Sequence, residues 1–257
     1  MRNFLAAIKL VKVLTHLLVG LLTVYFHFPK LTQTQKNRRI EVWAGELLAK
    51  LAIKLIVNGK PPKTGPMLLV SNHISWLDIL VIHAAGHCRF VSKADIKHWP
   101  ILGTLTTVGG TLYIERESRR DAMRVVHHMS EALVDGDIVA VFPEGTTGNG
   151  VDMLPFHANL LQAAIAVKAP VQPIALSFID SATGQTSQAA SFVGDETLLG
   201  SLWNTLKSCN LAAVAIYGVP QLANGRDRRT WAADLSTEIA SMRALPVRTS
   251  ASGSNQH

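Results

Sequence analysis

Met67-Leu-Leu-Val-Ser71 is a short apolar run that passes directly into the polar segment Asn72-His73-Ile74-Ser75-Trp76-Leu77-Asp78. A short and uninterrupted apolar run predicts a strand that is buried on both faces. Ser75, followed three residues later by Asp78, is a pattern that begins helices. The stretch therefore predicts a strand that turns sharply into a helix, the unit from which parallel sheets are built.

The same alternation of short apolar runs and amphipathic stretches continues along the chain. Val125, Met129 and Leu133, for example, recur at the steps that place side chains on one face of a helix. Strands that alternate with helices predict an α/β fold in which a largely parallel sheet is flanked by helices. After the first strand we expect helices over residues 118–134, 160–167 and 230–244, strands over 138–142, 171–179 and 211–217, and a loop over 181–191.

The composition of the 257-residue chain narrows the classes of protein to consider. Hydrophobic residues make up 48% and charged residues 17%, which is too apolar for a disordered chain or for a protein that coats nucleic acid. Lysine and arginine outnumber aspartate and glutamate by 25 to 18, which favours anionic lipid over nucleic acid as the partner. The two cysteines, Cys88 and Cys209, exclude a disulfide framework and a cysteine-only zinc site, and they suit a reducing compartment.

The amino-terminal residues 4–28 are mostly apolar, with Lys9, Lys12, His16 and His27 as interruptions. No small-x-small cleavage site follows the segment, which argues against a secretory signal peptide. The segment is therefore predicted to attach the protein to a membrane. A helix that spans the bilayer and a helix that lies in its interface are both compatible with this pattern.

A second helix is predicted over residues 40–56, where Trp43, Leu47, Leu51 and Leu55 form one stripe. Two roles are open for it: packing on the core of the domain, or pairing with the first helix in a membrane-docking hairpin. We therefore expect helices for membrane attachment at 1–57, an α/β domain at 58–245 and a disordered tail at 246–257.

Three short segments that lie at the ends of predicted strands carry reactive side chains, and open α/β sheets bind ligands at such positions. In the first segment, His73 leaves the strand and Asp78 follows five residues later. A histidine and a carboxylate can form a general base and the group that orients it. This requires that the helix begins at Ser75, so that His73 precedes the helix and Asp78 lies in its first turn. The competing interpretation is structural, because Asp78 also suits the start of the helix.

The second and third segments contain a cation and a carboxylate. Arg116 follows a predicted strand and precedes a helix, where a guanidinium beside free backbone amides suits a phosphate. Glu144 follows another strand and opens a glycine-rich turn, which exposes one carboxylate on a stiff support. The simpler interpretations are a solvated charge cluster for the second segment and an ordinary tight turn for the third.

Together and in this order, the segments resemble the glycerolipid acyltransferase family typified by 1-acylglycerol-3-phosphate acyltransferase. The resemblance covers residues 66–180 and implies a glycerol-3-phosphate acyltransferase-like α/β fold. It is carried by Asn72, His73 and Asp78; by Tyr113, Ile114, Glu115 and Arg116; by Phe142 to Thr146; by Val171 to Ala175; and by a lysine and a Pro-x-x-Gly turn at Lys93 and at Pro100 to Gly103.

The resemblance implies transfer of a fatty acyl group from acyl-CoA or acyl carrier protein to the hydroxyl of 1-acyl-sn-glycerol-3-phosphate, giving phosphatidic acid in phospholipid biosynthesis. It implies that His73 is the general base and Asp78 holds its ring, while the lysolipid hydroxyl is the nucleophile. The location implied is the cytoplasmic face of a bacterial inner membrane. No cofactor, metal or nucleic acid is expected to take part. The residues expected to bind substrate are Arg116, Glu144, Gly145, Thr146 and Lys93.

One departure from the family pattern bears on the acceptor. The third block of the family usually continues Gly-Thr-Arg-Ser, whereas this chain reads Gly145-Thr146-Thr147-Gly148. This version resembles a bacterial branch that includes lyso-ornithine-lipid acyltransferases, so another lysolipid is an alternative acceptor. A non-catalytic lipid-binding module is a second alternative. A zinc enzyme is disfavoured because the histidines are not grouped with carboxylates as ligands.

Overall fold

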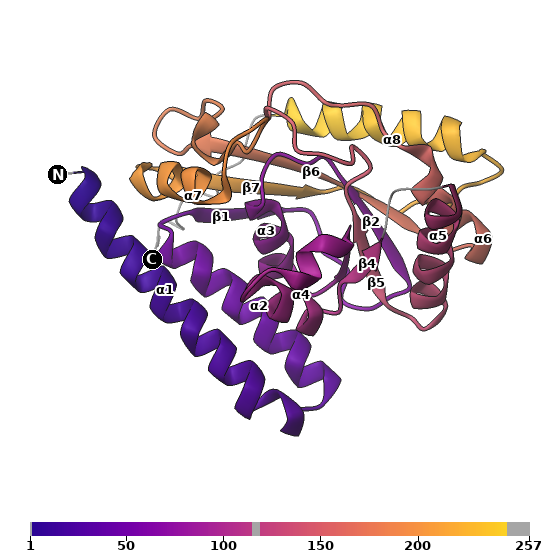
Figure 1. The fold of residues 1–257 in the computed structure, drawn as a ribbon. Coiled ribbons are helices and arrows are strands. Elements are labelled where there is room, and N and C mark those ends of the chain that lie inside the picture. Colours follow the sequence, from indigo (N-terminus) through magenta and orange to yellow (C-terminus); the bar gives the residue numbers. More distant parts are fainter. Residues whose placement is uncertain (1, 115–118, 246–257) are drawn as a thin grey trace, which may run out of the picture.

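The computed structural model of the chain describes residues 2–114 and 119–245, in which helices alternate with strands (Figure 1). The helices are α1 (Arg2–Phe26), α2 (Gln33–Lys50), α3 (Leu77–Ala85), α4 (Leu102–Val108), α5 (Arg119–Val134), α6 (Leu161–Val167), α7 (Leu198–Lys207) and α8 (Arg228–Arg243). Short 3₁₀ helices are η1 (Phe28–Lys30), η2 (Ala94–His98), η3 (Ala158–Leu160) and η4 (Gln188–Ala190). The strands are β1 (Lys54–Asn58), β2 (Met67–Ser71), β3 (Arg89–Lys93), β4 (Leu112–Ile114), β5 (Ile138–Val141), β6 (Val171–Asp180) and β7 (Leu211–Tyr217).

The strands of the described residues form one sheet in the order β1-β7-β6-β2-β5-β3-β4. β2 lies in the middle and pairs in parallel with β5 on one side and with β6 on the other. β3 and β4 extend the parallel part, whereas β7 runs antiparallel to β6 and carries β1 in parallel beside it. The sheet is therefore largely parallel, as the alternation of elements predicts, with one reversed pair of strands at an edge.

Helices cover both faces of the sheet and give three layers (Figure 1). Successive residues of a strand point to opposite faces. Leu69 accordingly packs in a core with α2, α3 and α7, whereas Leu68 and Val70 pack in a second core with α5, α6 and α8. All residues of β2 are buried, which confirms that this continuous apolar run marks a strand covered on both sides.

Most of the predicted elements are present with ends within two residues of expectation, namely α5, α6, α8, β2, β5, β6 and β7. The second predicted helix is wrong at both ends. α2 begins earlier, after a capping box in which Thr32 and Gln35 bond to each other's backbone, and it ends at Lys50. Leu47 and Leu51 are buried as the stripe predicts, but Leu55 lies in a strand.

Strand β1 overlaps the end of the range for which we predicted a helix. Residues 54–58 are partly or fully exposed, without a strict alternation, and pair with β7, a strand more than 150 residues later in the chain. Pairing at this sequence distance leaves no local signal, so an amphipathic run of this kind was open to a helical interpretation. Because β1 belongs to the sheet, the sheet begins inside the range 1–57 that we expected to serve membrane attachment.

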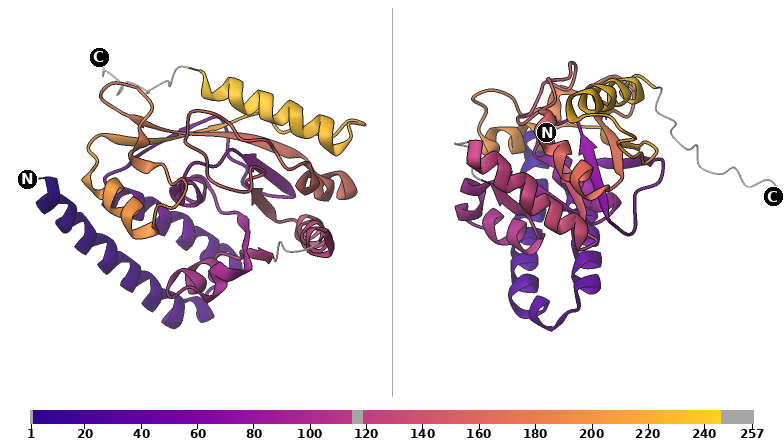
Figure 2. Two further views of the ribbon diagram at one scale, coloured as in Figure 1. Left: turned by 45° about the horizontal axis from the view of Figure 1, so that its top comes forward. Right: turned by 90° about the vertical axis from the view of Figure 1, so that its right-hand side faces the viewer.

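α1 and α2 form an antiparallel hairpin whose loop end projects beyond the sheet (Figures 1 and 2). Gly20 allows the two helices to approach, since a Cβ atom there would lie 2.5 Å from Nε1 of Trp43. His16, buried in the same contact, stacks on the Trp43 ring with 5.3 Å between ring centroids. α2 also packs on α3, so it contacts both the core of the domain and the first helix.

The opposite face of α1 is apolar and exposed. By length and composition, α1 is the helix of the described residues that could cross a membrane. A surface this rich in large apolar side chains indicates a site of contact with a membrane or a protein. The exposed side chains are Phe4, Leu5, Ile8, Val11, Leu14, Leu18, Val19, Leu22, Tyr25 and Phe26.

Candidate active site

The site is built on the corner where β2 passes into α3. Asn72, the first residue after the strand, is buried and continues the hydrogen-bond ladder towards β6 with its side chain. Its Nδ2 donates to the carbonyl oxygen of Leu176 at 3.0 Å, and its Oδ1 accepts from the Leu176 N–H at 2.8 Å. These two bonds hold the backbone that carries the next residue, His73, at a defined point on the edge of the sheet.

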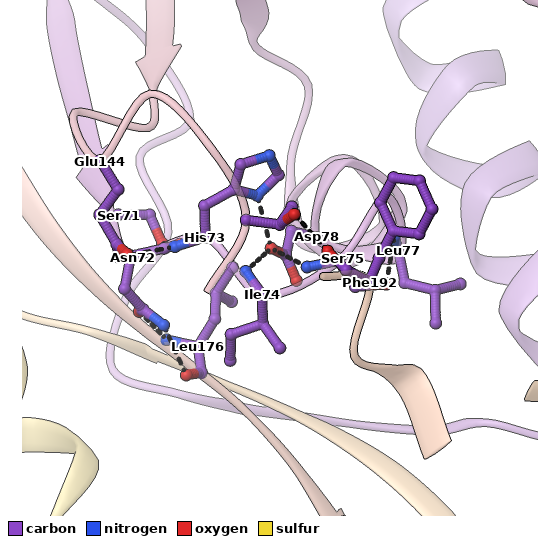
Figure 3. Close-up of polar contacts among 11 residues, drawn as sticks. Ser71, Asn72, His73, Ile74, Ser75, Leu77, Asp78, Glu144, Leu176 and Phe192 are labelled. Atoms are coloured by element: carbon purple, nitrogen blue, oxygen red, sulfur yellow. Dashed lines mark hydrogen bonds and ion pairs between the residues drawn. The ribbon is translucent and has the colours of Figure 1, made fainter. Parts of the chain in front are cut away.

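The side chains of His73 and Asp78 meet at this corner (Figure 3). Nδ1 of His73 lies 2.8 Å from Oδ2 of Asp78. A carboxylate can only accept hydrogen bonds, so Nδ1 carries the proton and donates it, which leaves Nε2 with a free lone pair. The same Oδ2 atom accepts from the backbone N–H groups of Ile74 at 2.6 Å and Ser75 at 2.9 Å. One buried carboxylate therefore supports the start of α3 and orients the imidazole, which unites the two competing interpretations.

The ring of His73 is held by packing as well as by Asp78. It stacks on Phe142, with 4.0 Å between ring centroids and an interplanar angle of 9°. The side chain retains 18% exposure, and within residues 2–114 and 119–245 no hydrogen bond to Nε2 is present. A fixed imidazole with one open basic nitrogen has the geometry required of a general base.

Glu144 lies beside His73, but both of its carboxylate oxygens are bonded to the protein backbone. Oε1 accepts from the N–H of His73 at 3.0 Å, and Oε2 accepts from the N–H of Leu154 at 3.1 Å. The side chain is 5% exposed, and this burial raises the pKa of Glu144. The carboxylate that we expected to project from the turn is thus turned inward, where it joins the loop after β5 to the loop after β2.

The glycine-rich turn after β5 encloses the His73 loop from a second side. The N–H of Gly148 donates to the carbonyl oxygen of His73 at 2.8 Å. The Thr147 hydroxyl donates to the carbonyl oxygen of Phe192, whose own N–H donates to the carbonyl oxygen of Ile74 at 3.2 Å. Sequence reasoning assigned no role to Phe192, because the segment around it contacts the site through backbone atoms and has no motif.

The remaining predicted binding residues differ in what can be said of them. Lys93 is exposed at the end of β3, where it pairs in register with Ile114 at the end of β4. Thr146 is exposed in the turn after Glu144. Arg116 lies outside the described residues. β3 runs parallel to β5, so Lys93 and Glu144 lie at the same side of the sheet, where the carboxyl ends of the strands meet. Among the described residues, the structure shows no direct bond between Lys93 and His73.

Comparisons with known proteins indicate the family of the chain. A family model described as acyltransferase matches residues 54–177. The chain is 37% identical to the lyso-ornithine lipid O-acyltransferase of Pseudomonas aeruginosa, over 67% of this chain and 65% of that protein. It is 36% identical to the 1-acyl-sn-glycerol-3-phosphate acyltransferase of Neisseria gonorrhoeae, over 75% of this chain and 76% of that protein.

A solved structure has the same fold. The 1-acyl-sn-glycerophosphate acyltransferase PlsC from Thermotoga maritima matches with a TM-score of 0.67 over 95% of this chain and 99% of that chain, at 17% identity. The order of the sheet, the helix pair at the amino terminus and the family match are thus consistent with one another. The chain belongs to the acyltransferase family and is an O-acyltransferase of the lysolipid class.

Proposed function

We propose that the protein transfers a fatty acyl group to the free hydroxyl of 1-acyl-sn-glycerol-3-phosphate and thereby forms phosphatidic acid. The observation that carries the proposal is the His73 ring, bonded to buried Asp78 through Nδ1 and open at Nε2. A relative that matches over 76% of its own length bears the name of this activity. A non-catalytic lipid-binding role would give no reason for a buried carboxylate that orients a partly exposed imidazole.

The reaction proceeds by attack of the lysolipid oxygen on the carbonyl carbon of an acyl thioester. Nε2 of His73 takes the hydroxyl proton as the C–O bond forms, and Asp78 stabilises the resulting imidazolium. The C–S bond then breaks, and the proton on Nε2 passes to the leaving thiolate of coenzyme A or acyl carrier protein. The side chain of His73 is thereby returned to its starting state, and no enzyme nucleophile is needed.

Arg116 and Lys93 are the proposed partners of the acceptor phosphate, with Gly145 and Thr146 shaping the turn opposite them. A charge-assisted hydrogen bond contributes about 1.5–3 kcal/mol. Arg116→Ala is therefore expected to raise the KM for the lysolipid by about ten- to a hundredfold, with little change in the KM for the acyl donor. Steady-state kinetics with each substrate varied in turn measures this, and an unchanged acceptor KM contradicts the assignment.

The proposed membrane location is supported by α1. Its apolar face is exposed, while its other face contacts both α2 and α7. Lys9 also fastens α1 to the domain, since its Nζ donates to the carbonyl oxygens of Leu206 at 3.1 Å and Ser208 at 3.0 Å. A helix held along the domain in this way suits a position in the membrane interface, with the apolar face in lipid. The inner membrane of a bacterium, at its cytoplasmic face, is the proposed location.

Lyso-ornithine lipid is the second candidate acceptor. Two observations favour it: the P. aeruginosa relative bears that name, and Thr147 stands where the family usually has an arginine. Thr147 is uncharged, and its hydroxyl is already bonded to the carbonyl oxygen of Phe192, so it does not replace the cation that the family's arginine offers to a phosphate.

One assay separates these candidates. The purified protein is incubated with an equimolar mixture of lysophosphatidic acid, lyso-ornithine lipid and lysophosphatidylglycerol, with acyl-CoA or acyl carrier protein as donor. Mass spectrometry of the lipids formed identifies the acceptor, and thiol release gives the rate. We expect phosphatidic acid to dominate, and the His73→Ala variant serves as the inactive control. Acylated ornithine lipid as the main product would support the second candidate, and no thiol release with any lysolipid would refute enzymatic transfer.

A further inference from the structure

The turn between η2 and α4 exposes two large apolar side chains in a strained conformation. Trp99 is 47% exposed and Ile101 is 43% exposed. Ile101 has φ +66° and ψ −58°, and the N–H of Leu102 donates to the carbonyl oxygen of Pro100 at 2.6 Å. This is a γ-turn of the rare form, which is unfavourable for a β-branched residue. Both the exposure of apolar area and the backbone strain carry a cost in water.

The turn is held firmly by its surroundings. The N–H of Gly103 donates to the carbonyl oxygen of Trp99 at 2.9 Å, and a Cβ atom at Gly103 would lie 2.1 Å from the carbonyl oxygen of Lys97. The hydroxyl of Tyr113 in β4 lies 2.6 Å from Oγ1 of Thr106 in α4. Hydrogen bonds thus fix the turn that carries the exposed apolar side chains, and α4, which follows the turn, is bonded to β4.

Basic residues precede the turn in the chain. Lys97 and His98 are exposed immediately before Trp99, and Lys93 is exposed at the start of η2. Asp95 is the acidic residue of this segment. Apolar and aromatic side chains flanked by cations suit the interface of an anionic bilayer, where tryptophan is favoured and lysine can reach the lipid head groups.

The location of the turn agrees with this chemistry. η2 follows the carboxyl end of β3. β2, whose carboxyl end leads to His73, is parallel to β3 and separated from it by β5 alone, so both strands end at the same side of the sheet. α4 also contacts α1, the helix with the exposed apolar face. The turn therefore extends the surface that the membrane proposal assigns to α1 towards the site.

We propose that Trp99 and Ile101 insert into the interface of an anionic bilayer and form a second membrane contact beside α1. This inference rests on the proposed membrane location of the enzyme. Lipid contact removes apolar area from water, which offsets the strain of the turn, and it holds the chain between β3 and β4 at the lipid surface from which the lysolipid arrives.

The test compares vesicle binding of the full-length protein and two variants. Vesicles of phosphatidylglycerol and phosphatidylcholine are sedimented with the wild type and with a Trp99→Ser/Ile101→Ser variant. The vesicle dissociation constant is expected to rise at least about tenfold. Val219→Ser/Leu222→Ser is the matched control. Val219 and Leu222 are 77% and 48% exposed and lie near the first residue of β6, at the amino ends of the parallel strands and so on the side of the sheet opposite to His73. Its binding is expected to equal that of the wild type.

A second variant separates the membrane contact from a purely structural role. Ile101→Gly removes the apolar side chain and at the same time suits the positive φ. It is expected to keep or raise the unfolding temperature while weakening vesicle binding by about fivefold. Wild-type vesicle binding by Ile101→Gly and by the double serine variant would overturn the proposal.

Activity on lysolipid presented in two forms completes the test. With lysolipid in vesicles, the double serine variant is expected to lose turnover in parallel with binding; with a monomeric short-chain lysolipid, its turnover is expected to match the wild type. Equal loss in both forms would overturn the proposal, because it would place the turn against the substrate itself. Should no lysolipid be acylated by any form of the protein, the proposed function fails, and the sedimentation result still decides the membrane contact.

Discussion

The two ends of α3 carry histidines with opposite environments. His73, just before the helix, is bonded to a buried carboxylate and keeps 18% exposure. His83, in the last turn, is buried beside His87 and Phe90, and its Nδ1 has no partner within the described residues. Burial and the neighbouring His87 lower the pKa of His83 to about 3. The same side chain is thus available for proton transfer at one end and held neutral at the other.

The magnitudes show which effect decides the state of His83. The carboxyl end of a helix favours a cation by at most about 2 kcal/mol. A pKa lowered to about 3 corresponds to a cost of about 5 kcal/mol for the charged form. Desolvation therefore outweighs the helix dipole. At the amino end, Asp78 supplies a direct acceptor for the ring, and this partner distinguishes the two histidines more than their position in the helix does.

The largest expected effect is the loss of activity on removal of the functional histidine. His73→Ala removes the general base and is expected to lower turnover by about 10²- to 10⁴-fold, with the fold intact by circular dichroism. His83→Leu is the matched substitution at the other end of α3 and is expected to keep turnover within about threefold of wild type, because a role in packing alone does not touch the reacting atoms. Equal losses in both variants would show that the helix ends do not differ in function.

A second effect tests whether Asp78 makes the difference between the two ends. Asp78→Asn removes the negative charge and weakens three hydrogen bonds to Oδ2. We expect a loss of about 1.5–3 kcal/mol in the free energy of unfolding and a fall in turnover of about ten- to a hundredfold. Denaturant unfolding and steady-state kinetics measure the two effects, with Asp135→Asn, an exposed site, as control. A drop in stability at full turnover would leave Asp78 with a structural role only.

The buried histidine predicts an acid-sensitive stability. Unfolded His83 has a pKa near 6.5 and binds a proton below that pH, whereas folded His83 does so only near pH 3. The free energy of unfolding is therefore expected to fall as the pH falls through this window, by about 2 kcal/mol between pH 7 and pH 5. His83→Leu is expected to remove this part of the slope in urea unfolding series. An unchanged slope would mean that the folded state accepts the proton.

The smallest expected effect concerns the link between the third block and His73. Glu144→Gln keeps an oxygen for one backbone N–H but places an amide nitrogen towards the other, at a cost of about 1 kcal/mol. Turnover is expected to fall a few-fold with the acceptor KM unchanged, since the side chain acts through the backbone of His73. A raised acceptor KM would instead favour the expectation that Glu144 binds the substrate directly.

The part of the site that lies within one short stretch was predictable. The strand at 67–71 and the distance from His73 to Asp78 follow from patterns within twelve residues, and the structure confirms the contact. The helix start was misplaced by one residue, because Trp76 and not Ser75 is the N-cap of α3. The inward position of Glu144 was not predictable, because its oxygens accept hydrogen bonds from distant backbone N–H groups. These belong to His73, 71 positions earlier in the chain, and to Leu154, 10 positions later. The resemblance assigned Glu144 to the substrate, and local sequence offered no sign of the backbone partners.

The sequence by itself determined the α/β alternation, the strand buried on both faces and the histidine–carboxylate corner, because each depends on the chemistry of neighbouring residues. Only the tertiary structure decided that residues 54–58 form a strand, since their hydrogen-bond partners lie in β7. It also decided that His83 stays neutral while His73 faces solvent, since desolvation comes from side chains that the fold brings together. Local patterns specify conformation, whereas burial and long-range pairing specify which groups are left to react.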